Sequence, residues 1–175
     1  MKQENTAPLR VGIAGLGRLG KRHAEQLARH TPGARLVAAC SPVAEEFDWA
    51  RETLGVPRLY ADYAELLADP EIDAVVLVTP TTLHADQTSA ALRAGKHVFV
   101  EKPLSLDVAT CEAVEAVARD YPDQVAMVGF VRRFDPSYAR AKAAIDAGQL
   151  GRPFLVRSQT CDQNDPAGFF VRFAP

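Results

Sequence analysis

The sequence predicts an α/β protein: a doubly wound parallel sheet over residues 1–128, followed by the incomplete start of an α+β second domain over residues 129–175. Short apolar runs alternate with longer segments of helical periodicity, which is typical of a parallel sheet covered by helices. A glycine-rich turn follows the first apolar run, where such sheets begin their first helix. The alternation stops near residue 128, and the first domain is therefore expected to end there.

Six apolar runs are expected to form the strands of this sheet. Some of them, such as residues 74–78 (AVVLV), are nearly continuous stretches of β-branched and aliphatic residues. This pattern indicates strands that helices cover on both faces. The expected strands are residues 9–14, 36–40, 58–60, 74–78, 97–100 and 125–128.

Helices are expected between these strands, at residues 18–29, 42–54, 83–93 and 106–119. Ser41 and Ser105 are the expected N-caps of the second and fourth helices, with Pro42 at the first helical position. Gly95 is expected just past the end of the third. Beyond the sheet we expect a helix at 136–147, a strand at 153–160 and a tail, 163–175, without a clear element. One helix and one strand cannot close a second core.

Composition excludes several classes of protein. The 175 residues carry a net charge of −2 with mixed signs, which argues against nucleic-acid or anionic-membrane partners. No segment has the apolar length of a signal peptide or a membrane span, so a cytoplasmic protein is expected. Cys40, Cys111 and Cys161 lack metal-ligand spacing, and we expect reduced thiols and no metal site. An unfinished sheet and an apolar tail predict self-association into a homo-oligomer.

The glycine-rich turn fits the pattern G-x-G-x-x-G, with Gly15, Gly17 and Gly20 as its glycines and Leu16, Arg18 and Leu19 between them. The first glycine permits a tight turn, the second lets a pyrophosphate approach the backbone, and the third lets the helix pack closely on the strand. The helix N-terminus then offers N–H donors to the phosphates. The turn therefore predicts NAD or NADP binding in a Rossmann domain. A purely structural turn and a methyltransferase are the alternatives.

The choice between NAD and NADP stays open at the end of the second strand. An Asp or Glu there normally binds the adenosine ribose of NAD, but this sequence has Ser41. Loss of that carboxylate favours NADP, whereas the absence of a following Arg or Lys and the nearby Glu45 and Glu46 favour NAD. Ser41 is also a candidate helix cap without any cofactor role.

Glu101, Lys102 and Pro103 follow the fifth strand directly. Ligands of open α/β sheets bind beyond the carboxyl ends of the strands, which is where these residues fall. A lysine there can polarise a carbonyl or stabilise an alkoxide during hydride transfer. The alternative is a surface lysine beside a turn proline.

Several segments together resemble the Gfo/Idh/MocA oxidoreductases, and within them the branch that acts on cyclitols. The resemblance covers essentially the whole chain and is more specific than the glycine turn alone. It is carried by residues 15–24 (GLGRLGKRHA), 79–85 (TPTTLHA), 94–103 (AGKHVFVEKP), 129–135 (GFVRRFD) and 145–153 (IDAGQLGRP).

The resemblance implies hydride transfer between a nicotinamide and a secondary alcohol of a cyclitol or sugar. It implies that Lys102 lies at the reacting hydroxyl and that Arg132 borders the substrate. It also implies a cis peptide bond between Lys102 and Pro103, which would fix the direction of the lysine. It also implies that Thr79, Pro80 and His84 lie beside the nicotinamide and that Glu101 holds the ribose or the loop. From the residues alone, His84 is equally a histidine that caps its own helical turn.

Members of the family carry an Asp-x-x-x-His pair in their second domain, where the histidine exchanges the alcohol proton. This sequence has no histidine after His97. A lysine with an ordinary pKa of about 10.4 is cationic at neutral pH and is a poor proton acceptor. We therefore expect weak or no turnover by these 175 residues. The alternative to an enzyme is a catalytically impaired dinucleotide-binding fragment or sensor.

Overall fold

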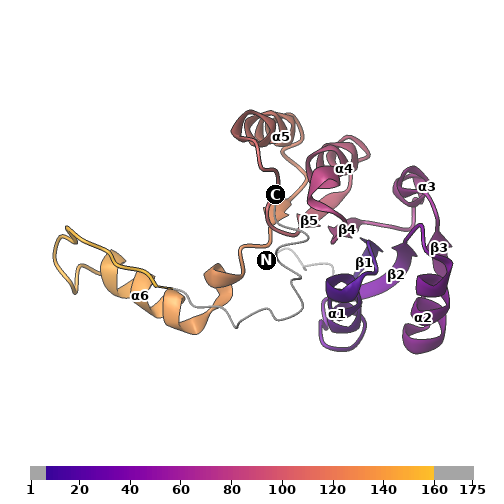
Figure 1. Cartoon of the computed structure of the whole chain (residues 1–175), viewed down its shortest axis with the longest axis horizontal. Helices are drawn as coiled ribbons and strands as arrows, with labels where there is room; N and C mark the ends of the chain where they lie inside the picture. The colour runs from indigo at the N-terminus through magenta and orange to yellow at the C-terminus, as the bar shows by residue number, and fades with distance from the viewer. Residues whose placement is uncertain (1–6, 160–175) are drawn as a thin grey trace, which may run out of the picture. The chain divides into compact units, whose positions relative to one another are not determined.

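The computed structural model describes residues 7–159, in two units that divide after Phe130. The first unit is built on a six-stranded sheet of order β3-β2-β1-β4-β5-β6, in which every pair is parallel. The order reverses at β1, as in a doubly wound sheet, and the predicted fold class is confirmed (Figure 1). The strands are β1 (Leu9–Ala14), β2 (Ala34–Cys40), β3 (Arg58–Tyr60), β4 (Ala74–Leu77), β5 (His97–Val100) and β6 (Ala126–Val128).

Helices cover both faces of this sheet. Figure 1 shows α1 and α2 on one face and α3, α4 and α5 on the other. This arrangement follows from right-handed crossovers between parallel strands. The helices are α1 (Arg18–Arg29), α2 (Ala44–Leu54), α3 (Tyr63–Ala68), α4 (Thr81–Arg93) and α5 (Val108–Asp120).

Each face of the sheet has its own apolar core. Alternate residues of a strand point to opposite faces, and β1 shows this directly: Val11 and Ile13 join the core under α1 and α2, whereas Ala14 joins the core under the other three helices. All four residues of β4 are buried. The apolar runs in the sequence therefore reflect burial on both faces.

Two helix starts differ from the prediction. Helix α2 begins at Ala44 with Val43 as its N-cap, so Ser41 is not the N-cap and Pro42 is not the first helical residue. The Ser41 N–H instead donates to the Tyr60 carbonyl, 3.1 Å away, and this bond keeps Ser41 in line with the sheet.

Helix α5 begins at Val108, because the Asp107 carboxylate accepts the Thr110 N–H at 2.7 Å and caps the helix. The predicted cap at Ser105 and start at residue 106 are therefore wrong. Helix α3 was not predicted. It has six residues, too few for an apolar period to be visible, and Asp62 caps it by accepting the Ala64 N–H.

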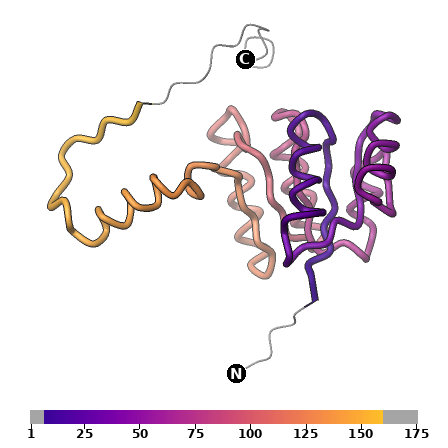
Figure 2. The backbone as a smooth tube through the Cα atoms, turned by 90° about the horizontal axis from the view of Figure 1, so that it is seen from below, coloured from indigo at the N-terminus to yellow at the C-terminus, as the bar shows by residue number. Residues whose placement is uncertain are grey.

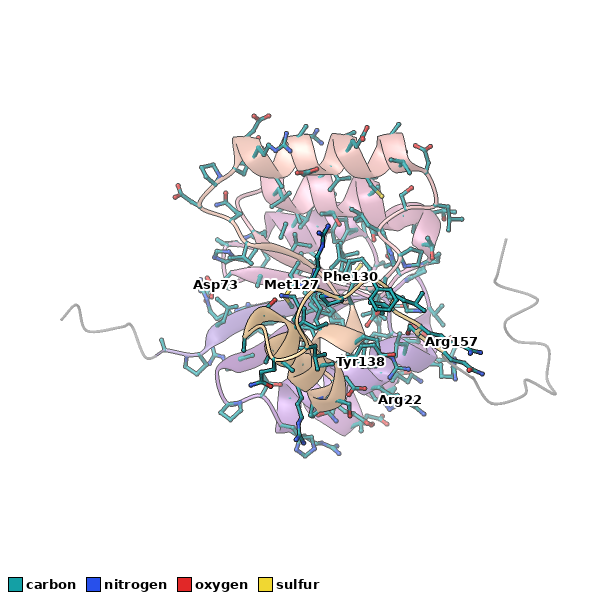
Figure 3. The ribbon with its side chains drawn as sticks, turned by 90° about the vertical axis from the view of Figure 1, so that its left-hand side faces the viewer. Arg22, Asp73, Met127, Phe130, Tyr138 and Arg157 are labelled. Atoms are coloured by element: carbon teal, nitrogen blue, oxygen red, sulfur yellow. The ribbon has the colours of Figure 1, made fainter. Side chains whose placement is uncertain are left out.

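Ion pairs and buried hydrogen bonds fix the amino edge of the sheet. Arg10 on β1 contacts Asp73, labelled in Figure 3, through Nε–Oδ2 at 2.9 Å and Nη2–Oδ1 at 2.6 Å. The guanidinium lowers the pKa of Asp73 to about 2. Lys96, buried before β5, donates to the carbonyl oxygens of Asp69 and Ile72.

The second unit begins at Val131. It contains a 3-10 turn, η1 (Val131–Phe134), and the helix α6 (Pro136–Asp146), the orange helical segment in Figure 2. Asp135 caps α6 by accepting the Ser137 N–H at 2.9 Å.

Residues 153–159 form no strand, contrary to the prediction for 153–160. A strand requires a neighbouring strand, and the strand ladders found within residues 7–159 do not include this segment. The tail 163–175 and Cys161 lie outside the described residues. No helix within residues 7–159 is long and apolar enough to cross a membrane.

Candidate dinucleotide site

The glycine turn joins β1 to α1 and brings three chain segments into close contact. Gly15 has φ +89°, and a Cβ added there would lie 2.5 Å from the Val78 carbonyl oxygen just beyond β4. A Cβ at Gly20 would lie 2.0 Å from the Gly15 carbonyl oxygen, so α1 can approach the turn only because residue 20 has no side chain. At Gly17 no atom lies within 4 Å of the added Cβ. Gly17 therefore leaves its side of the turn open, as the second glycine of the pattern does where a backbone is approached closely.

The N-terminus of α1 opens at the same place. Gly17 is its N-cap and supplies no side-chain acceptor, and no acidic residue lies in the first turn. First-turn N–H groups have no partner within their helix, and the helix dipole makes this end attractive to anions. Leu16 is fully buried in the core, whereas the side chains of Arg18 and Leu19 are exposed. The turn can therefore offer backbone donors to a phosphate, with the Leu16 side chain turned away.

His84 connects two of the predicted site loops. It lies in the first turn of α4, is 2% exposed, and places Nε2 2.8 Å from the Thr79 carbonyl oxygen and Nδ1 2.7 Å from that of Pro103. The Thr79 hydroxyl donates to Oε1 of Gln87 on the same helix. Pro80 is the N-cap of α4. Because both ring nitrogens face carbonyl oxygens, the histidine holds the loops after β4 and β5 together.

The loop after β5 carries Glu101, Lys102 and Pro103, and the Lys102–Pro103 peptide is cis, as the resemblance implied. Glu101 Oε1 lies 2.9 Å from Nε2 of His23 on α1, and its other oxygen accepts the Lys102 N–H at 3.1 Å. This contact ties the helix of the glycine turn to the loop of the lysine. The Lys102 side chain is exposed, and its ammonium group forms no ion pair within residues 7–159.

Ser41 lies at the carboxyl end of β2, beside the glycine turn. The Gly15 N–H donates to the Cys40 carbonyl at 2.9 Å. Because Ser41 is the next residue after Cys40, it lies beside the turn. Ser41 is 1% exposed. Its hydroxyl oxygen accepts the Val43 N–H, and its hydroxyl proton is donated to Oε2 of Glu46.

Arg132 belongs to the second unit, where it lies in η1. Its guanidinium contacts Asp135 at 3.2 Å and lies over the Tyr138 ring, 5.4 Å from the ring centroid. These contacts are local to η1 and α6.

Sequence reasoning did not assign a role to His23 or a partner to Glu46. His23 meets Glu101 across 78 positions of the chain, and no local pattern reports such a distant pair. For Glu46 the signal existed, because its proximity to Ser41 in the sequence was evident, but Glu45 was equally close.

The remaining titratable groups do not suggest another chemistry. Burial raises the pKa of the Cys40 thiol to about 11, so this thiol is neutral at physiological pH and is a weak nucleophile. Over residues 7–159, no group of three His, Cys, Asp or Glu side chains could hold a metal ion.

Taken together, the fold and the open glycine turn define a dinucleotide-binding domain of the Rossmann class. The comparison with protein families agrees: the model of the Gfo/Idh/MocA family, an oxidoreductase family with an NAD-binding Rossmann fold, matches residues 9–130. The chain belongs to this family. Membership removes the methyltransferase alternative.

Several of the proteins and solved structures that are similar to this chain are inositol dehydrogenases. Scyllo-inositol 2-dehydrogenase (NAD(+)) of Bacillus subtilis is 41% identical over 164 residues, which are 94% of this chain and 48% of that protein. Scyllo-inositol dehydrogenase from Lactobacillus casei, solved with bound NAD(H) and scyllo-inositol, is 43% identical with a TM-score of 0.79 over 82% of this chain and 42% of that one.

A 3-ketoreductase from Actinomadura kijaniata, solved with TDP-benzene and NADP, is 32% identical with a TM-score of 0.71. That match covers 81% of this chain and 44% of the other. The chain spans about half the length of the curated relatives it matches.

Proposed function

We propose that this chain is the cofactor-binding part of an NAD-dependent dehydrogenase that oxidises a secondary alcohol of a cyclitol, with an inositol as the substrate. The observation that carries the proposal is the meeting of the glycine turn, the Thr79 loop and Lys102 at the carboxyl edge of one sheet. The similarity to scyllo-inositol dehydrogenases supports the cyclitol. Of the two cofactors predicted, NAD or NADP, these relatives favour NAD.

The cofactor's pyrophosphate is proposed to bind at the glycine turn, with the open side of Gly17 facing it. The backbone of residues 15–20 supplies the donors, and Leu16 contributes only its backbone because its side chain is buried. Ser41 lies at the adenosine ribose, whereas Thr79, Pro80 and Glu101 lie at the nicotinamide end. When bound, NAD supplies the hydride acceptor for the alcohol carbon.

Lys102 is proposed as the catalytic residue. Its ammonium group stabilises the negative charge that develops on the alcohol oxygen as the hydride leaves, and the hydroxyl proton passes to solvent water, because no histidine follows His97 in this sequence. His84 positions this lysine indirectly, because it holds the Pro103 carbonyl against the Thr79 loop. Arg132 is proposed to bind the hydroxyl groups of the polyol or sugar together with Lys102.

For the remaining partners, we propose a homo-oligomer in the cytoplasm. An apolar groove of about 540 Å³, lined in part by Val76, Phe99 and Met127, lies on the α1 face of the sheet. Exposed apolar surface of this kind favours association. Cys40 and Cys111 are free thiols, which is typical of a reducing compartment. The net charge of −2 does not favour binding to nucleic acid or to a membrane surface.

The test is NAD⁺ reduction by the full chain with scyllo-inositol, myo-inositol and glucose, followed by nicotinamide absorbance. The proposal expects weak but measurable reduction with an inositol, because no histidine follows His97 to accept the alcohol proton. This reduction should be lost in Lys102→Met but not in Lys142→Met, a matched exposed lysine on α6. NADH binding without reduction by any of the three would support the dinucleotide-holding alternative. Failure of a folded chain to bind NADH would contradict both.

A further inference from the structure

We propose that Glu46, oriented by Ser41, is the residue with which this domain selects NAD over NADP. The inference rests on the proposed dinucleotide function and deepens it. It assigns to a carboxylate on α2 the task that an acid at the end of β2 performs in NAD-binding Rossmann domains.

The first step is the position of Ser41. Residue Cys40 is the last of β2 and pairs in register with Ala14, the last of β1. The Gly15 N–H donates to the Cys40 carbonyl at 2.9 Å. Ser41 therefore stands next to the glycine turn, where the acid of an NAD site would stand.

The second step is the direction of the Ser41 hydroxyl. It has one proton, which it donates to Oε2 of Glu46, while its oxygen accepts the Val43 N–H at 3.1 Å. Both bonds bind the hydroxyl to the start of α2. In return, the Glu46 carboxylate is held at the end of β2, where it can accept further hydrogen bonds, such as those from ribose hydroxyls.

The third step is charge. The 2′-phosphate of NADP carries roughly −1.5 to −2 charges at neutral pH, and a carboxylate beside it is repelled. Residues 42–46 contain no Lys or Arg to compensate. Two cations of α1 reach α2: the Lys21 ammonium lies 5.0 Å from the centre of the Trp49 ring, one turn beyond Glu46, and the Arg29 guanidinium donates to the Thr53 carbonyl at the far end of the helix.

Glu45 provides a matched control. It lies one position earlier in the same first turn and carries the same charge, but it is exposed, and the hydrogen bonds of the Ser41 hydroxyl go to Glu46 and Val43 instead. A charge effect that acts through space alone would be similar for Glu45 and Glu46. A specific contact with the ribose would distinguish them.

The experiment measures dissociation constants of the full chain for NADH and NADPH by nicotinamide fluorescence, and for ADP-ribose and 2′-phospho-ADP-ribose by calorimetry. The second pair lacks a nicotinamide and reports on the adenosine end alone. The measurements compare wild type with three variants, Glu46→Gln, Glu45→Gln and Lys21→Gln. Circular dichroism and thermal unfolding establish that each variant is folded.

We expect wild type to bind the unphosphorylated member of each pair at least about tenfold more tightly, and Glu46→Gln to lower that ratio by about tenfold. Glu45→Gln and Lys21→Gln should leave the ratio within about twofold of wild type. Equal affinities in wild type, or equal effects of Glu46→Gln and Glu45→Gln, would overturn the inference. Binding of ADP-ribose without NADH would instead contradict the proposed function and leave the selectivity of Glu46 supported by the second pair.

Discussion

Replacement of Gly20 by alanine tests the packing on which the site depends. The added Cβ would lie 2.0 Å from the Gly15 carbonyl oxygen, whereas real Cβ contacts almost never fall below 3.0 Å. Helix α1 and the turn must therefore separate by about 1 Å. This movement displaces the first-turn N–H groups from the position at which they can bind a pyrophosphate.

The magnitude follows from two opposing effects. Overpacking of a close contact costs about 1–3 kcal/mol, and the better helix propensity of alanine returns about 0.5–1 kcal/mol. A net loss of about 1–2 kcal/mol corresponds to a melting temperature lower by about 2–8 °C in a chain of this size. Affinity for NADH should fall by about tenfold or more, because displaced donors make longer hydrogen bonds.

Two matched glycine variants separate stability from binding. Gly17→Ala adds a methyl group to open space at a backbone φ of −62°, so it should preserve the melting temperature and still weaken NADH binding by obstructing the phosphate. Gly33→Ala also meets no atom within 4 Å but lies at the other end of α1 and should change neither quantity. The assays are thermal unfolding by circular dichroism and NADH fluorescence titration.

A Gly20→Ala variant with wild-type melting temperature and wild-type NADH affinity would show that the close approach of α1 to the turn is not needed for the site. A Gly17→Ala variant that binds NADH as wild type does would refute the assignment of the open space to the pyrophosphate.

Three further predictions concern the rest of the first unit. Arg10 lowers the pKa of Asp73 from 3.8 to about 2, so the Asp73 carboxylate stabilises the fold above about pH 4 and loses this effect as the pH falls towards 2. Urea unfolding should therefore show Asp73→Asn less stable than wild type at pH 7, and the difference in unfolding free energy should shrink at low pH. A gap that stays constant with pH would contradict this. Lys96→Met leaves the Ile72 carbonyl without its donor, whereas the Asp69 carbonyl keeps the Ile72 N–H at 3.3 Å; the variant should cost about 1–3 kcal/mol of unfolding free energy, with NADH affinity unchanged because Lys96 lies at the amino edge. His84→Phe should cost a similar amount but also weaken NADH binding, since it releases the Thr79 loop; unchanged NADH affinity in a destabilised His84→Phe would argue against that coupling.

The sheet could be predicted closely from the sequence. All six strands occur where apolar runs were found, with starts that differ by at most two residues. Such agreement is expected when both faces of a sheet are buried, because each strand then shows its burial in consecutive residues. The positions of Gly15, Gly17 and Gly20 were equally visible, since a close backbone approach requires a residue type that nothing else replaces.

Features that depend on distant or competing partners could not be predicted. Ser41 and Ser105 have the composition of helix caps, but Ser41 remains bonded to β3 and Asp107 is the stronger competitor for α5. Residues 153–159 have strand composition but form no strand. The contact of His23 with Glu101 exists only because the sheet order places β5 near α1.

Binding of a dinucleotide at the glycine turn is measured residue by residue through amide chemical-shift mapping of the full chain. On addition of NADH, the largest shifts should fall on residues 15–20, with further shifts at Ser41, Thr79 and Glu101–Lys102. A folded chain whose amides at 15–20 do not respond to saturating NADH, or whose shifts cluster at the amino edge near Asp73 and Lys96, would contradict binding at this turn.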